Sequence, residues 1–162
     1  MLSMSRMGTH AIRKMLARTS LVATTTALLL AGTTSAAQAH TETEAIQAGC
    51  GSGYSIVRDG QRAVVTSAGS IWGQVYLTYN ASNGMNCVVT RKTTFHGTPT
   101  RTLARLQVQN RGLPVEDWAW YSHFAAVKAY GKGACVAYWG DIRDGSGYNA
   151  AGGRWLFDNC SS

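Results

Sequence analysis

Serine, histidine and carboxylate side chains in the second half of the chain could in principle form a hydrolytic centre. Ser146 lies in Asp144-Gly145-Ser146-Gly147, and His123 with Asp117 or Asp141 would complete a Ser–His–Asp triad. No serine lies in a G-x-S-x-G nucleophile elbow, however, and Asp, Gly and Ser all favour turns. The sequence therefore favours a loop over a nucleophile, and we expect no catalytic residue.

Two other kinds of catalytic or metal centre are equally poorly supported. A glycoside hydrolase needs two carboxylates facing each other across a cleft, and the spacing of the acidic residues from Glu116 to Asp158 fixes no such pair. Zinc sites usually contain closely spaced ligand pairs, yet there is no C-x-x-C motif, and His40, His96 and His123 are scattered. We expect no metal and no cofactor.

Aromatic residues are the more promising binding groups. Five Trp and seven Tyr accompany only three Phe, and such amphipathic rings stack on sugars or anchor protein contacts. Trp118, Trp120 and Tyr121 follow an acidic loop and do not fit a core pattern. We therefore expect these three residues to form an exposed binding cluster.

The four cysteines point to an oxidising compartment. Cys50, Cys87, Cys135 and Cys160 form an even set in a small chain, which is typical of two disulfides in an exported protein.

The N-terminal segment agrees with export. Basic residues in the first 18 positions, an uncharged stretch over 21–32 and Ala37-Gln38-Ala39 predict a signal peptide over residues 1–39. Residues 40–49 are polar and predict a flexible arm, and residues 50–162 predict one folded domain.

Residues 40–162 keep eleven Lys and Arg against eight Asp and Glu, a net charge of +3 that argues against a nucleic-acid partner. No stretch after residue 39 predicts a transmembrane segment.

Turn signals about every ten to fifteen residues, between short runs rich in Val, Thr, Tyr and Trp, predict an all-β sandwich or barrel. The clearest unit is a hairpin over residues 74–94, with alternating side chains and a turn at Asn83-Gly84. Residues 115–130 remain ambiguous. Their aromatic and β-branched content favours a strand, but Glu116, Asp117 and Lys128 also suit the ends of a helix.

Strand order suggests a cysteine pairing. If residues 54–57 pair antiparallel with residues 75–79, Cys50 lies close to Cys87 beyond the hairpin turn. If residues 134–139 pair antiparallel with residues 154–159, Cys135 meets Cys160. We favour Cys50–Cys87 and Cys135–Cys160 among the three possible pairings.

Three motifs indicate a known family. These are CGSGY at 50–54, VYLTYNASNGMNCVVT at 75–90 and YGKGACVAYWG at 130–140. Together with Asn159-Cys160 they resemble the spore-associated protein A family of small exported proteins of filamentous actinobacteria. The resemblance implies a secreted, disulfide-bonded β protein found with spores or the cell exterior, and it supplies no catalytic residues.

We therefore expect a secreted, non-catalytic protein that binds, or forms part of, the surface layer of the spore or cell envelope. Its partners would be envelope polymers or an extracellular protein. The sequence leaves open a secreted inhibitor of an extracellular hydrolase, which would present Trp118–Trp120 or the loop over 143–153. A carbohydrate-binding module or a small secreted hydrolase comes third. The oligomeric state does not follow from the sequence.

Overall fold

The computed structural model describes residues 39–160, and the predicted signal peptide lies outside the described residues apart from Ala39. One helix and eight strands follow each other in the order α1 (Glu42–Cys50), β1 (Ser55–Thr66), β2 (Ile71–Asn80), β3 (Met85–Lys92), β4 (Thr100–Val108), β5 (Val115–Tyr121), β6 (Phe124–Tyr130), β7 (Val136–Arg143) and β8 (Asn149–Asp158). The all-β prediction is confirmed.

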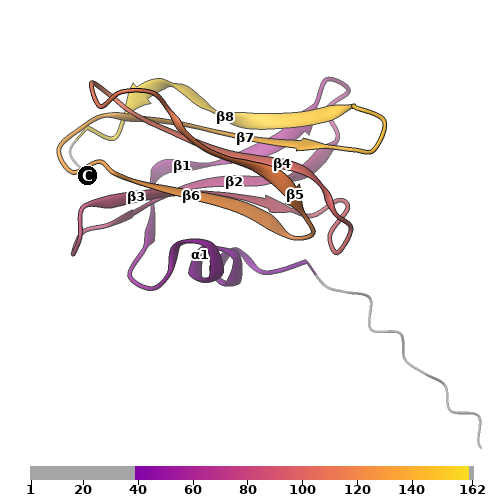
Figure 1. Ribbon diagram of the computed structural model, residues 1–162, viewed down its shortest axis with the longest axis horizontal. Helices are drawn as coiled ribbons and strands as arrows, with labels where there is room; N and C mark the ends of the chain where they lie inside the picture. Colours follow the sequence, from indigo (N-terminus) through magenta and orange to yellow (C-terminus); the bar gives the residue numbers. More distant parts are fainter. Residues whose placement is uncertain (1–38, 161–162) are drawn as a thin grey trace, which may run out of the picture. The chain divides into compact units, whose positions relative to one another are not determined.

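The eight strands form one antiparallel sheet that curls into a nearly closed barrel (Figure 1). Their order is β5-β4-β7-β8-β1-β2-β3-β6, so consecutive strands β5 and β6 lie at the two ends of the sheet. In Figure 1 strands β5, β4, β7 and β8 form one layer, and β1, β2, β3 and β6 form the other, with α1 against the outside of the second. The main core lies between the layers and includes Val75, Leu77, Leu106, Val136 and Ile142.

The predicted hairpin is present as β2 and β3. Leu77 pairs with Val88, and the turn over residues 81–84 places Gly84 at a φ of 71°, which glycine adopts without strain. Both faces of β2 are buried, because Val75 and Leu77 enter the main core while Tyr76 lies in a second cluster beneath α1. A strand covered on both sides shows that α1 belongs to the packed structure.

Residues 115–130 form two strands, so the strand alternative is correct. β5 and β6 meet at a corner over residues 122–123, and each pairs with a different neighbour, β5 with β4 and β6 with β3. Strands form here because aromatic and β-branched side chains fit a pleated surface that is covered on one side.

The expected flexible arm over residues 40–49 is corrected by the structure, since residues 42–50 form helix α1. Thr41 and Glu44 make a reciprocal capping box: the Thr41 hydroxyl accepts from the Glu44 N–H, and the Glu44 carboxylate accepts from the Thr41 N–H. Ala45 and Ile46 are buried against the sheet. Although the segment is mostly polar, its two buried apolar residues pack the helix against the sheet. The disulfide of Cys50 then holds the helix in place.

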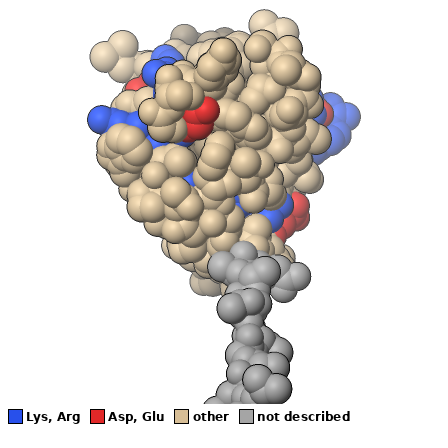
Figure 2. Space-filling model, turned by 90° about the vertical axis from the view of Figure 1, so that its right-hand side faces the viewer, with Lys and Arg blue, Asp and Glu red and all other residues tan. Residues whose placement is uncertain are grey.

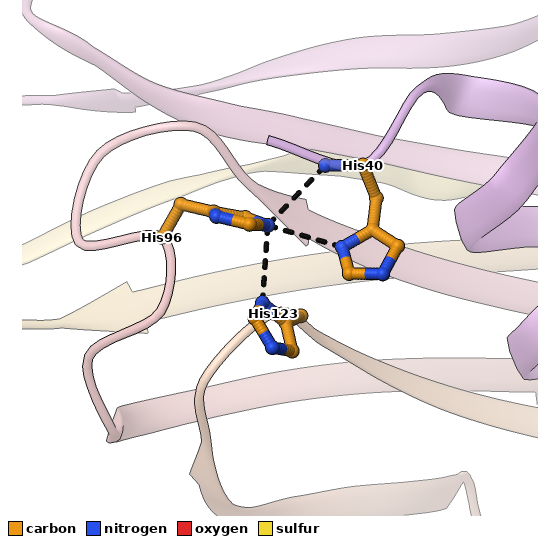
Figure 3. Close-up of side chains that lie close together, drawn as sticks. All are labelled: His40, His96 and His123. Carbon is orange, nitrogen blue, oxygen red and sulfur yellow. Dashed lines mark hydrogen bonds between the residues drawn. The ribbon is translucent and has the colours of Figure 1, made fainter. Parts of the chain in front are cut away.

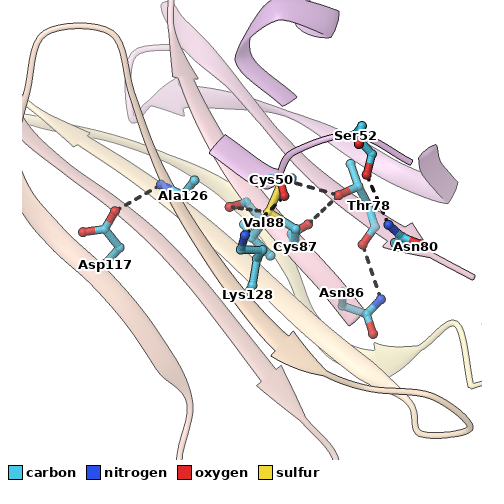
Figure 4. The surroundings of a disulfide bond; sticks show 10 residues. All are labelled: Cys50, Ser52, Thr78, Asn80, Asn86, Cys87, Val88, Asp117, Ala126 and Lys128. Carbon is cyan, nitrogen blue, oxygen red and sulfur yellow. Dashed lines mark hydrogen bonds between the residues drawn. A yellow bond between two sulfur atoms is a disulfide. The ribbon is translucent and has the colours of Figure 1, made fainter. Parts of the chain in front are cut away.

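The disulfides are Cys50–Cys87 and Cys135–Cys160, the pairing that the expected strand order favours. Figure 4 shows Cys50, at the end of α1, joined to Cys87 of β3. Thr78 donates to the Cys87 carbonyl at 3.1 Å, and the Lys128 ammonium donates to the Cys50 carbonyl at 3.2 Å. The disulfide and the Lys128 bond thus attach the end of the helix to β3 and β6.

Within residues 39–160, no helix combines the length and the apolar character that crossing a bilayer requires.

Candidate functional site

The outer face of the β5-β4-β7-β8 layer carries indole rings beside guanidinium groups. Because side chains alternate along a strand, Trp118 and Trp120 point outward from β5, whereas Tyr121 points inward and packs against the main core. Neighbouring strands add residues to the same side. We call this set the aromatic–arginine face; it comprises Arg101, Arg105, Trp118, Trp120, Trp139, Arg143 and Trp155.

Strand register determines the contacts on this face. Arg101 lies opposite Trp120 in the β4–β5 ladder, and its guanidinium carbon is 5.7 Å from the Trp120 ring centroid and 5.8 Å from that of Trp118. Arg143 of β7 lies on the same face, and its guanidinium carbon is 4.9 Å from the Trp118 ring centroid. These distances fit cation–π contacts, which hold each charge beside an apolar ring.

A surface hollow of about 370 Å³ lies within the face. It is lined by Leu103, Arg105, Glu116, Trp118, Trp139, Asp141, Arg143 and Trp155. The Arg105 Nε lies 3.1 Å from a Glu116 oxygen, and the Arg143 Nε lies 3.3 Å from an Asp141 oxygen. The hollow therefore combines ring surfaces with donors and acceptors of both signs, as a site for a polar ligand with apolar patches requires.

Of the three predicted binding residues, the structure brings two together outside and places the third inside. Trp120 is 59% exposed and Trp118 is half-buried, whereas the Tyr121 hydroxyl donates to Asp117. This bond, together with burial, raises the pKa of Tyr121 to about 12. Tyr121 is thus a structural residue at the junction of β5 and β6.

The three histidines between residues 39 and 160 meet at one point, although they are far apart in the sequence (Figure 3). His40 precedes α1, His96 lies in the loop between β3 and β4, and His123 lies at the β5–β6 corner. The Nε2 atom of His96 is 3.0 Å from Nδ1 of His40 and 3.0 Å from Nδ1 of His123. One ligand atom from each ring lies within 4.8 Å of the others.

Main-chain bonds hold this histidine cluster in place. The N–H of Gly97 donates to the Ser122 carbonyl at 2.8 Å, and the N–H of Lys92 donates to the His123 carbonyl at 2.9 Å. The Arg91 guanidinium donates to the His40 carbonyl at 2.6 Å. Three separate segments are therefore fixed next to one another by bonds that do not involve the imidazole rings.

Burial and flanking cations favour the neutral form of His96. Burial lowers the pKa of His96, and the neighbouring His123, His40, Lys92 and Arg91 lower it further. Burial also lowers the pKa of Lys92 to about 8, although its ammonium donates to the carbonyls of Thr98 and Tyr121. Neutral imidazoles present lone pairs, which are what metal ions bind.

The residues considered for a catalytic triad are engaged in different places. The Ser146 hydroxyl donates to Asp144 within an exposed turn, His123 contacts His96, and Asp141 accepts from Asn149 at 2.7 Å. Asp117 accepts from Tyr121 and from the backbone of Ala126. Each candidate therefore has a local structural partner.

The histidine cluster was missed because no local spacing reveals it. The signal that would have found it is the pairing of β3 with β6, in which Arg91 lies opposite Phe124. That register places the segment after Arg91, which contains His96, beside His123. Non-local pairing of this kind does not follow from short motifs.

Comparison with known proteins supports the resemblance drawn from the motifs. The chain is 38% identical over 101 residues to Spore-associated protein A of Streptomyces coelicolor, which covers 62% of this chain and 60% of the relative. The resemblance to the spore-associated protein A family is thus confirmed, while the chain spans about 60% of that relative's length. No protein-family model matches the chain, and no solved structure matches it.

Proposed function

We propose that this chain is a secreted, non-catalytic protein of the spore or cell envelope that binds an anionic, sugar-containing polymer through the aromatic–arginine face. The observation that carries the proposal is the position of Arg101, whose guanidinium lies against both Trp118 and Trp120 on an outward-facing strand.

The chemistry of the face supports such a ligand. Indole rings pack against the apolar faces of sugars, and guanidinium groups bind phosphate or carboxylate in a fixed planar geometry. Trp139 and Trp155 extend the ring surface, with centroids 4.5 Å apart, and Arg105 lies 5.3 Å from the Trp155 ring. A polymer that offers sugars and anionic groups in alternation would match both components.

Two further observations support an extracellular, envelope-bound role. Two disulfides are typical of proteins that work in an oxidising compartment. The name of the relative describes a spore-associated protein, and we extend that association to this chain. Figure 2 shows one face with charged side chains in small separate groups, an arrangement that suits local contacts better than a broad electrostatic attraction to nucleic acid.

The proposal is tested by co-sedimentation of the disulfide-intact protein with Gram-positive cell-wall sacculi, before and after their phosphate-linked anionic polymers are removed. We expect binding to the untreated sacculi, weakened by removal of the polymer and by salt, which screens exposed charges. The double variant Trp118→Ala/Trp120→Ala and the variant Arg101→Gln should each bind about tenfold more weakly, as expected for central interface residues.

Tyr148→Ala is the matched control, because Tyr148 is an exposed ring, 72% accessible, in the turn between β7 and β8 and outside the aromatic–arginine face. It should bind like the parent protein. Equal binding by all variants would overturn the assignment of the face. Absence of sedimentation, combined with stoichiometric loss of activity in a panel of proteases and amylases, would replace the proposal with the hydrolase-inhibitor alternative.

A further inference from the structure

We propose that His40, His96 and His123 form a copper(II) site, and that the α-amino group of His40 completes it once the predicted leader is removed after Ala39. The inference rests on the geometry of the histidine cluster and on the predicted cleavage position. It is independent of the aromatic–arginine face. The mature chain would then bind the metal with four nitrogen atoms from three segments.

The nitrogen separations suit a single metal ion. With metal–nitrogen bonds of about 2.0–2.1 Å, neighbouring ligands at right angles lie roughly 2.9 Å apart and opposite ligands roughly 4.1 Å apart. The two separations from Nε2 of His96 are both 3.0 Å, and all three ring atoms fall within 4.8 Å. Small rotations of the imidazole rings would therefore bring all three to bonding distance.

The protonation pattern directs a lone pair into the cluster. The backbone N–H of His40 can only donate, and it donates to Nε2 of His96 at 3.2 Å. Nε2 is therefore unprotonated, and the neutral ring carries its proton on Nδ1, which is buried without a hydrogen-bond partner among the described residues. The single lone pair on His96 Nε2 faces three nitrogen atoms, and it cannot accept a good hydrogen bond from all of them. A cation at the centre of the cluster would instead be bound by each ring.

Removal of the leader would change the chemistry of one of these atoms. In the uncleaved chain the nitrogen of His40 is an amide, which has no lone pair available for a metal. Cleavage after Ala39 converts it into a primary amine whose pKa in model compounds is near 8, so a metal can displace its proton at neutral pH. The amine and Nδ1 of the same residue would then close a six-membered chelate ring, with His96 Nε2 next to both.

The donor set selects the metal. Four neutral nitrogen donors favour late first-row ions, and copper(II) binds such sets most strongly and accepts a tetragonal arrangement. No carboxylate belongs to the described cluster, and Arg91 and Lys92 lie nearby, so hard oxygen-seeking cations such as Ca²⁺ and Mg²⁺ gain nothing here. Neighbouring positive charge lowers affinity for every cation, but least for ions whose bonds to imidazole are partly covalent.

The site is held ready for the ion before it binds. His40 lies two residues before α1, and α1 is capped at Thr41 and joined to β3 by Cys50–Cys87. The loop that carries His96 is hydrogen-bonded to the corner that carries His123. Little chain entropy would therefore be lost on binding, which favours affinity.

The test compares two oxidised proteins, one that begins at His40 and one that keeps residues 35–39 before it with its terminal amine acetylated, because a free amine at Gln38 would chelate Cu²⁺ together with His40. Each is titrated with Cu²⁺ in competition with a chelator, and its nitrogen coordination is recorded by electron paramagnetic resonance. Residues 40–162 contain no histidine besides the three in the cluster, so an imidazole signal has a single source. We expect one copper ion per chain with four nitrogens in the first protein. The extended protein should bind more weakly and show one nitrogen fewer.

The variants His96→Gln and His123→Gln should lose more affinity than the roughly 10–100-fold that removal of an outer hydrogen-bond partner costs. Asp144→Asn, in an exposed turn, is the control and should bind like the parent. Unfolding measured in EDTA, with both disulfides intact, verifies the fold of each variant. Binding that is absent, unchanged in the histidine variants, or displaced by equimolar zinc would overturn the copper site. Identical spectra from the two parent proteins, or a natural N-terminus other than His40, would overturn the role of the amine.

Discussion

Asp117 of β5 accepts a hydrogen bond from the backbone N–H of Ala126 in β6, at 3.1 Å (Figure 4). These two strands are the ends of the sheet, and the side chain supplies a bond at the position where a ladder bond would otherwise join them. The same carboxylate accepts from the Tyr121 hydroxyl. Asp117 thus connects the two end strands, β5 and β6, along the seam between them, and it also stabilises the corner that joins them.

We expect Asp117→Ala to lower the free energy of unfolding by about 1–3 kcal/mol, because it leaves the Ala126 N–H and the Tyr121 hydroxyl without their acceptor. Chemical denaturation measures the loss, and hydrogen exchange should show faster exchange at the Ala126 amide. Glu116→Ala, on the same strand as Asp117, removes an exposed ion pair with Arg105 of β4 and should cost less than about 1 kcal/mol. Equal effects of the two substitutions would contradict the role of the seam.

The two disulfides should differ in their sensitivity to reductants. Cys50 and Cys87 are 4% and 0% exposed, whereas Cys160 is exposed and Cys135 half-buried. Mild reduction followed by alkylation and mass spectrometry should therefore label Cys135 and Cys160 first. Simultaneous labelling of all four cysteines would show that the protein unfolds globally before either bond is reduced.

Close packing inside the sheet makes Gly152 intolerant of a side chain. A Cβ atom there would lie 2.0 Å from the Ala63 carbonyl oxygen, a main-chain atom that cannot move aside without disturbing β1. We expect Gly152→Ala to destabilise the protein by about 1–3 kcal/mol, as overpacking does. Gly145→Ala is the matched control, since Gly145 lies in an open turn with no atom within 4 Å of its Cβ position. Its melting temperature should stay near that of the parent.

Alkaline pH should weaken the fold through Tyr138. Burial raises the pKa of its phenol above the ordinary value near 10, against the opposing effect of Arg62 and Arg154. The unfolded chain therefore loses this proton at lower pH than the folded chain, and stability falls as the pH rises past about 10. Tyr138→Phe removes the hydrogen bond to the Asp59 carbonyl, so it should be less stable at pH 7 but lose less stability between pH 9 and 11. Parallel pH curves for the two proteins would contradict this assignment.

Local signals in the sequence predicted much of the fold. Alternation and the Asn83-Gly84 turn were sufficient for the β2–β3 hairpin, and the cysteine pairing followed from two expected strand pairs. Helix α1 could have been found from the Thr41-x-x-Glu44 capping signature, but polarity outweighed it. Trp118 and Trp120 lie on the outer face as the sequence predicts, whereas Tyr121 points inward because side chains alternate along β5.

The histidine cluster depends on information of a different kind. It requires β3 to pair with β6, two strands separated by β4 and β5, and no residue pattern determines that choice. The pairing depends on the strand order of the whole sheet, in which β6 lies at one end beside β3. The aromatic–arginine face likewise needs β4 between β5 and β7, an order visible only in the folded structure.

The two sulfur bridges close separate segments of chain, 50–87 and 135–160, that neither overlap nor interleave. If the polypeptide emerges from a membrane amino end first, an oxidant meets the first and second cysteines well before the third. If each cysteine pairs with the next one to emerge, Cys50 joins Cys87 and Cys135 joins Cys160, which is the native connectivity. The order of the cysteines along the chain would thereby make oxidative folding largely free of wrong pairings, with little need for a thiol isomerase.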